Sequence, residues 1–344
     1  CLNRCPSLCI ICQRKTLLRT SHVSFRAIGF YVITLSMMVL LFGLSIRLGT
    51  YTLSFEEIWA AFQPDDKNYF TLMEYRLPRA VLAILLGGAL AISGVLVQSV
   101  VRNPLASPDI LGINNAAGLV AVSVLMFLPN LAFYWMPIFA FLGGVLSFVI
   151  LWIVCGFNFR PIKMAIIGVA LSALWAAISH YLMLTNPVEI NTAMLWLTGS
   201  LWGRSWSYLN VVLPWLVVLL PLPFIFCRDL DTLGLGENKA STLGVTVNKV
   251  QISVLVLAVA LSTTAVAICG PIAFLGLVAP HLARRLVGGR HRTLLPAALI
   301  IGALLLQLSD ILARVIDPPT ELPAGILTAI IGAPYFFYLL MRTK

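Results

Sequence analysis

The stretch Ala80–Val101, AVLAILLGGALAISGVLVQSVV, runs between Arg79 and Arg102 without a charged residue. A helix needs roughly 20 predominantly apolar residues to cross the hydrocarbon core of a bilayer, and this stretch has that length. Its glycines and alanines allow helices to approach closely where lipid supplies no hydrophobic driving force. The stretch therefore predicts a membrane-spanning helix that packs tightly against other helices.

The rest of the chain repeats this pattern. Hydrophobic residues make up 60% of the 344 residues and charged residues only 10%, whereas soluble domains carry about 25% charged residues. A water-exposed surface needs charge and a lipid-exposed surface does not, so the composition excludes a soluble domain of any size. We expect an all-α polytopic membrane protein with about ten transmembrane helices, at residues 27–46, 80–101, 109–128, 133–155, 162–184, 208–227, 250–269, 272–288, 295–314 and 324–341.

The basic residues decide the number of crossings. The net charge of +10 does not indicate a nucleic-acid partner, because Lys and Arg are scattered in short loops between apolar runs. The eighth run is interrupted by Pro280, His281 and two arginines. With ten crossings most of the 23 Lys and Arg residues lie on the cytoplasmic side, whereas with nine the two sides are nearly equal. We therefore expect ten crossings with both termini in the cytoplasm.

The first 26 residues differ from the rest. They are rich in cysteine, and Cys9 and Cys12 form a CxxC pair that no second pair completes into a metal site. An over-extended reading frame would explain this tract, and we assign it no role. The domain division is therefore an N-terminal extension, 1–26, followed by a ten-helix transmembrane domain, 27–344.

The chain carries no GxxxxGK[ST] loop with which to bind ATP phosphates. Its polar inner loop, 228–249, instead contains several glycines, which can end short helices. The segment from Glu237 to Leu243 is long enough for two helical turns. It is either a short helix that a partner grips or a solvated connector, and the residues leave both open.

The remaining polar groups in the apolar segments are explained by structural roles. Two prolines in Arg102–Gly112 predict a broken helix, which either lines a water-filled path or forms a plain turn. Asp310 and Arg314 are spaced for an intrahelical ion pair near the outer end of the ninth span.

Catalytic or metal-ligand spacing is not found, so we expect neither an enzyme nor a cofactor. Single polar residues are expected to cap helices or bond between them (Asn114, His180, His281), and three tryptophans of the outer loop to form an interfacial belt (Trp196, Trp202, Trp206).

Several stretches together resemble one known family. They are EYRLPR (74–79), RNPLASPDILGIN (102–114), LTGSLWGRSW (197–206), LGLGENKASTLGV (233–245), GPIAFLGLVAPHLARRLVGGRHR (270–292) and ELPAGILTAIIGAP (321–334). The chain resembles the FecCD/BtuC-like permeases of ABC importers, which carry iron–siderophore complexes, haem or vitamin B12. The stretches LMEYRLPR and WLTGSLWGRSWS are most similar to the branch that carries ferric dicitrate.

The resemblance implies a type II importer fold and a set of partners. These are a second permease subunit, a paralogue that would make a heterodimer, two cytoplasmic ATPase subunits, and a periplasmic substrate-binding protein. The chain would lie among the lipids of the bacterial inner membrane, be non-catalytic itself, and pass an iron(III) chelate, ferric dicitrate, into the cytoplasm. Another siderophore, haem or vitamin B12 stays open as the substrate. A proton- or sodium-coupled secondary transporter is the rival from another class.

The resemblance also implies roles for particular residues. Arg76, Arg79 and Arg314 match arginines that receive acidic side chains of the binding protein. Asn103 and Leu105 match part of a cytoplasmic gate. Pro161 and Ile162 stand where the vitamin B12 transporter has small hydroxyl residues in a further gate, so we do not transfer that gate. The segment 229–249 matches the coupling helices that contact the ATPase, through Leu233, Leu235, Gly236, Glu237, Ala240, Leu243 and Gly244.

Overall fold

The computed structural model describes residues 29–128, 135–156, 161–186 and 190–342, and these residues form helices and connecting segments. The cysteine-rich extension expected over residues 1–26 lies outside the described residues. The helices are Gly29–Arg47, α2 (Phe55–Ala60), η1 (Phe70–Arg76), α3 (Leu77–Val101), η2 (Pro108–Leu111), α4 (Ile113–Phe127), α5 (Met136–Cys155), α6 (Pro161–Thr185), α7 (Ile190–Leu197), α8 (Trp206–Leu219), η4 (Leu222–Phe226), α9 (Cys227–Leu233), α10 (Glu237–Thr242), α11 (Val247–Cys269), α12 (Leu275–Val287), α13 (His291–Val315) and α14 (Ala324–Arg342).

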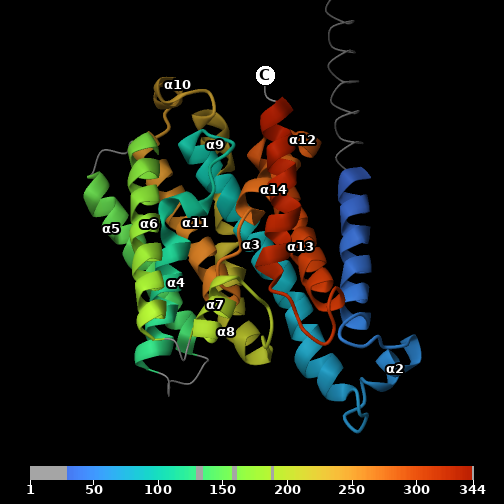
Figure 1. Cartoon of the computed structure of the whole chain (residues 1–344). Helices are drawn as coiled ribbons and strands as arrows, with labels where there is room; N and C mark the ends of the chain where they lie inside the picture. Colours follow the sequence, from blue (N-terminus) through green and yellow to red (C-terminus); the bar gives the residue numbers. More distant parts are fainter. Residues whose placement is uncertain (1–28, 129–134, 157–160, 187–189, 343–344) are drawn as a thin grey trace, which may run out of the picture.

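The long helices lie side by side in one bundle (Figure 1). In the described part of the chain, seven are long and apolar enough to cross a membrane, and Ile113–Phe127 and Ala324–Tyr338 are shorter apolar helices. We call the two ends of the bundle the α2 end and the α10 end, after the short helix that lies at each (Figure 1). The first helix begins at the α10 end and α14 finishes there (Figure 1).

The doubtful eighth run crosses the bundle in two parts. The preceding helix α11 stops at Cys269 near the α2 end, where the Cys269 carbonyl accepts a hydrogen bond from the Ser200 amide. The next helix, α13, starts at the α10 end (Figure 1). Between them, non-helical residues lead to α12, whose 13 residues span only about 20 Å. The expected crossing at 272–288 is therefore present, as a short helix preceded by a non-helical segment.

Helix α3 forms the centre of the bundle, with most of its residues buried against α11, α12 and α13. Two of its three glycines face glycines of its neighbours. A Cβ atom added at Gly87 would lie 2.5 Å from the carbonyl oxygen of Gly302 in α13, and one at Gly94 would overlap the carbonyl of Gly276 in α12. The small residues that the sequence placed on this helix thus let three backbones meet, as membrane helices require.

The segment 47–79 is largely structured, because α2 and the π-helix η1 lie in it and η1 runs directly into α3. One expectation about loops needs correction. The tryptophans of 185–207 do not form a common belt. Trp196 is buried, and the Trp206 indole N–H donates to the Met73 carbonyl at 2.7 Å, so only Trp202 is strongly exposed. The bond from Trp206 ties the loop to η1, whereas Trp196 packs into the apolar core and its indole nitrogen has no hydrogen-bond partner among the described residues.

Candidate functional site

A buried charge cluster lies at the α2 end, and we call it the arginine network: Arg76, Arg79, Asp310, Arg314 and Glu321. The Arg79 guanidinium contacts Asp310 through Nε at 2.8 Å and Glu321 through Nη1 at 2.7 Å. Asp310 also pairs with Arg314 at 3.1 Å, which confirms the expected i,i+4 ion pair. One carboxylate therefore holds arginines from two different helices, α3 and α13.

The rest of the arginine network binds backbone. Arg314 Nη1 donates to the Ser45 and Leu48 carbonyls at 3.1 and 3.3 Å, beside a side-chain bond from Nη2 to the Ser45 hydroxyl at 2.7 Å. Arg76 donates to the carbonyls of Ile46, Arg47 and Tyr51 at 2.6 to 2.8 Å. These carbonyls lie at and just after the end of the first helix, where backbone acceptors lack helical partners. The two arginines thus fix the first helix and the following turn against α3 and α13.

The three arginines expected at a docking surface are therefore deep inside the chain. Arg76 is 2% exposed, and Arg79 and Arg314 are each 1% exposed. Their guanidinium groups point to partners within the same chain, so an acidic side chain of a second protein reaches them only if this arrangement opens. A role in docking stays a prediction.

A hollow of about 850 Å³ opens beside the arginine network. This volume is within the usual range of small-molecule sites, roughly 300 to 1,000 Å³. Its wall joins α7, the segment after it and the turn before α14, and it combines charged, hydroxyl and aromatic side chains. The lining includes Tyr75, Thr192, Trp196, Ser200, Arg204 and Glu321. Tyr75 and Glu321 connect this hollow to the arginine network, because the tyrosine hydroxyl donates to Glu321 at 3.0 Å and accepts from Arg79 at 2.8 Å.

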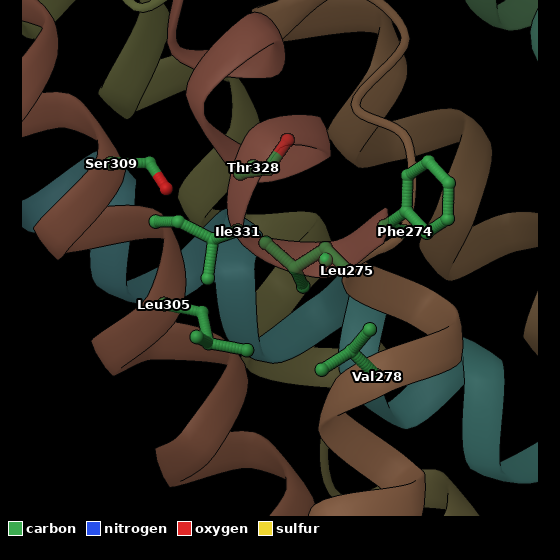
Figure 2. A pocket seen from close by; sticks show the side chains of 8 residues that line it. Phe274, Leu275, Val278, Leu305, Ser309, Thr328 and Ile331 are labelled. Carbon is green, nitrogen blue, oxygen red and sulfur yellow. The ribbon is translucent and has the colours of Figure 1, made fainter. Parts of the chain in front are cut away.

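A second cavity lies between α12, α13 and α14 (Figure 2). Ser309, Leu305, Thr328 and Ile331 face Leu275 and Val278 of α12 across it, and Phe274 stands at its edge (Figure 2). Its space of about 10 Å³ admits roughly one water molecule. A chelate does not fit there, so the hollow at the α2 end is the better candidate for a solute.

The expected gate residues lie in a turn at the α10 end, residues 102–107, which we call the gate loop. Asn103 is exposed, and its side-chain oxygen accepts a hydrogen bond from the Leu105 amide at 2.9 Å. Leu105 is itself 38% exposed. After Leu105 the chain turns inward, and Ala106 to Pro108 are buried. The asparagine thus holds a tight turn that presents Leu105.

The expected coupling residues, within 229–249, form α9, α10 and the turns beside them. Helix α10 has six residues, fewer than the two full turns that the sequence suggested. Leu233 and Ala240 are buried and anchor the segment. Gly236 and Gly244 adopt positive φ angles of 108° and 86°, which favour glycine, at the two ends of α10. Leu235 and Leu243 are exposed by 59% and 66% and flank α10.

The structure brings together polar groups that sequence reasoning treated as unconnected. At the α10 end, His291 bonds to Asp231 through Nδ1 at 2.6 Å and to the Ser99 hydroxyl through Nε2 at 2.7 Å. Arg102 forms an ion pair of 2.9 Å with Glu237. No spacing in the sequence indicates these pairs, because their members are far apart along the chain.

The remaining polar candidates are placed as follows. Asn114 donates to Asp109 and accepts from Ser262 at 3.4 Å, so it bonds between helices as expected. Two expectations were wrong: His180 is exposed on α6 instead of bonding between helices, and His281 lies inside α12 instead of capping it, with its ring 6.1 Å from that of Tyr335. Helix α6 begins at Pro161. Among the described residues, no group of three or more His, Cys, Asp and Glu side chains is placed to hold a metal ion.

Comparison with known proteins decides the family. The model of the FecCD transport family matches residues 37–342, which cover almost all of the described chain. The chain belongs to the FecCD transport family. All the residues of the arginine network, the gate loop and α10 lie within the matched range.

Two curated relatives and one solved structure are similar to this FecCD-family chain along most of its length. The Fe(3+) dicitrate transport system permease protein FecD of Escherichia coli (strain K12) is 51% identical, over 88% of this chain and 94% of that protein. The Fe(3+)-citrate import system permease protein YfmE of Bacillus subtilis (strain 168) is 41% identical, over 94% and 97%. A metal-chelate type ABC transporter in an inward-facing conformation has a TM-score of 0.80 at 29% identity, over 93% of this chain and 99% of its own.

Proposed function

We propose that this chain is a permease subunit of an ATP-driven importer that carries an iron(III) chelate, ferric dicitrate, from the periplasm to the cytoplasm. The observation that carries the proposal is the 51% identity to the Escherichia coli dicitrate permease along nearly the whole of both chains. The similarity to a second citrate import permease from a distant bacterium supports the same substrate. The chain itself forms part of the translocation path, and ATP binds to the partner ATPase subunits.

The sidedness follows from charge. Many basic residues belong to segments at the α10 end: Arg102 pairs with Glu237 of α10, Lys239 lies in α10 itself, and Arg285 lies in the last turn of α12, whose label is near the same end of the bundle (Figure 1). Positively charged loops are retained in the cytoplasm. The α10 end is therefore cytoplasmic and the α2 end periplasmic in the bacterial inner membrane, with both termini in the cytoplasm.

The side chains exposed at each end of the bundle indicate which partner protein binds there. Two ATPase subunits bind at the α10 end, where the exposed Leu235 and Leu243 offer apolar side chains to a groove. A periplasmic binding protein docks at the α2 end above the hollow beside Tyr75 and Arg204. A paralogous permease subunit packs alongside and completes the path.

The arginines have a revised part in docking. Arg76, Arg79 and Arg314 carry three positive charges against the two of Asp310 and Glu321, so the arginine network keeps an excess of positive charge at the α2 end. This excess attracts acidic side chains of a docked binding protein and a negatively charged chelate. Direct contact requires the turn before α14 to move away from Arg79.

The transport cycle follows from these placements. ATP binding closes the ATPase pair, the coupling segment moves, and the two permease subunits alternate between states open to each side. The gate loop, with Leu105 at its tip, closes the cytoplasmic end of the path while the chelate occupies the hollow at the other end. The iron and its organic ligand cross the membrane together, and the binding protein determines which chelate is transported.

The decisive experiment uses the complete complex in proteoliposomes, with binding protein outside and ATP inside. We expect uptake of radiolabelled iron(III) citrate that requires hydrolysable ATP and is unaffected by an uncoupler. Competition by excess unlabelled iron citrate, but not by a ferric hydroxamate, haem or vitamin B12, identifies the chelate. Uptake that persists without ATP and stops with the uncoupler would instead identify a secondary transporter.

A further inference from the structure

The C-terminal end of α3 has an unusual backbone. Arg102, the residue after the helix, has φ 55° and ψ 34°, in the left-handed region. Glycine usually occupies this position because a side chain there costs about 1 kcal/mol or more. An arginine stands where glycine would be easier, and its backbone leads directly into the gate loop. Such a residue indicates that its side chain has a task.

That side chain reaches the coupling segment. Arg102 Nη2 lies 2.9 Å from Oε1 of Glu237, the first residue of α10. The same oxygen accepts a hydrogen bond from Gln251 Nε2 at 3.3 Å, and Gln251 of α11 is 1% exposed. The buried amide holds the carboxylate from one side and Arg102 holds it from the other. Glu237 thus joins α10 to both α11 and the start of the gate loop.

A second link reaches the same turn of α3. Ser99 lies one helical turn before Arg102, and its hydroxyl is 2.7 Å from Nε2 of His291. Nδ1 and the backbone amide of His291 bond to Asp231 of α9 at 2.6 and 2.9 Å. Both short helices of the coupling segment are therefore connected to the last turn of α3, through side chains that differ in chemistry.

The two links differ in burial, and this separates their roles. The His291 side chain is 9% exposed and its Asp231 partner 40% exposed, so the imidazole end of this link is fixed inside the bundle. The Arg102 and Glu237 side chains are 35% and 49% exposed. An exposed ion pair contributes only about 0–1 kcal/mol to stability, so it breaks and re-forms at little cost. A weak, exposed ion pair can break and re-form during the transport cycle. It is therefore better suited to a moving contact between α10 and the gate loop than to stabilising the fold.

We propose that Arg102 and Glu237 are positioning residues that transmit movement of α10 to the gate loop. When the ATPases displace α10, the Glu237 carboxylate pulls or releases Arg102, and the turn that begins there repositions Asn103 and Leu105. This inference rests on the function proposed above. It adds the specific contact through which ATPase closure reaches the gate.

Charge reversal in the assembled complex tests the contact. Arg102→Glu is expected to keep ATP hydrolysis stimulated by the binding protein while the iron taken up per ATP falls roughly tenfold, and Glu237→Arg, whose residue lies in the segment assigned to the ATPase contact, is expected to lower the same ratio. Arg102→Gly keeps the left-handed backbone and removes the guanidinium, so we expect the same loss. The double variant, Arg102→Glu with Glu237→Arg, restores the pair with opposite polarity and is expected to recover at least half of the coupling. Arg285→Glu, an exposed charge change on α12, is the matched control and should leave the ratio unchanged.

The outcomes separate failure of the Arg102–Glu237 contact from failure of the proposed function. Unchanged uptake per ATP in both single variants, with a transporting wild-type complex, overturns the role of the pair alone. Loss in both singles without recovery in the double variant also overturns it, provided that all variants assemble and hydrolyse ATP. A wild-type complex that takes up no iron citrate with ATP would overturn the proposed function, and this inference with it.

Discussion

Five charged side chains lie inside the bundle at the α2 end, and each has an ion-pair or hydrogen-bond partner within the chain. Asp310 is 0% exposed and lies between Arg79 and Arg314. A carboxylate at such depth is tolerated because two cations and a fixed geometry replace its hydration. Since it is engaged by two arginines, Asp310 is poorly placed to carry protons across the membrane.

Replacing Asp310 by Asn should destabilise the protein strongly. The change leaves Arg314 buried without its counterion and Arg79 with Glu321 alone, and breaking a buried pair costs about 3–5 kcal/mol. The thermal unfolding midpoint in detergent measures the effect. Asp317→Asn, at an exposed carboxylate that accepts from Thr320, is the control and should change stability by about 0.5 kcal/mol or less. Equal midpoints for the two variants would show that the arginine network does not hold the fold.

Among the elements, α3 and α13 cross where two glycines face each other. A Cβ at Gly87 would stand 2.5 Å from the Gly302 carbonyl, and the backbone there cannot retreat as a flexible side chain would. Close approach of this kind gives membrane helices much of their packing energy. The crossing also holds the arginine network together, because Arg79 and Asp310 lie on these same two helices.

The variant Gly87→Ala should lower stability by roughly 1–3 kcal/mol, the usual effect of overpacking a close contact. Gly43→Ala is a matched control in the first helix, where an added Cβ meets nothing within 4 Å. It should be neutral or slightly stabilising because alanine favours helix. Both are compared by thermal unfolding in the same detergent. A neutral Gly87→Ala would mean that the two helices are free to separate.

The coupling segment is an element whose function depends on what it leaves exposed. Changing Leu243 to Asp should prevent the ATPase subunits from co-purifying with the permease, because a charge would then enter an apolar groove. The fold should remain intact, since Leu243 is 66% exposed. Thr52→Asp at the α2 end is the control and should co-purify normally. Normal association of the Leu243 variant would move the ATPase contact elsewhere.

At the scale of the whole molecule, the arrangement predicts which end faces which compartment. Thr52→Cys at the α2 end should react with a membrane-impermeant maleimide in intact spheroplasts, and Ser241→Cys in α10 only after lysis. The cysteines at 155, 227 and 269 are buried and should contribute little background. The N-terminal cysteines are replaced by serine for this measurement. Labelling in the reverse order would invert the orientation and, with it, the assignment of partners.

The amino-acid sequence by itself determined the class of the molecule, because long apolar runs and the placement of Lys and Arg depend only on local composition. It therefore predicted the spans, including the interrupted one at 272–288, and the pairing of Asp310 with Arg314, which are four residues apart. The family resemblance rested on local motifs in the same way, and the FecCD match confirms it.

Only the tertiary structure decided which distant groups meet. The burial of Arg76 and Arg79, the joining of Arg79 to Glu321 and the contact between Arg102 and Glu237 all depend on how helices cross. Hydrophobic periodicity does not encode such contacts, because one polar residue on an apolar helix is compatible with many partners. Local chemistry thus sets which segments enter the membrane, and packing between segments sets what each charge does there.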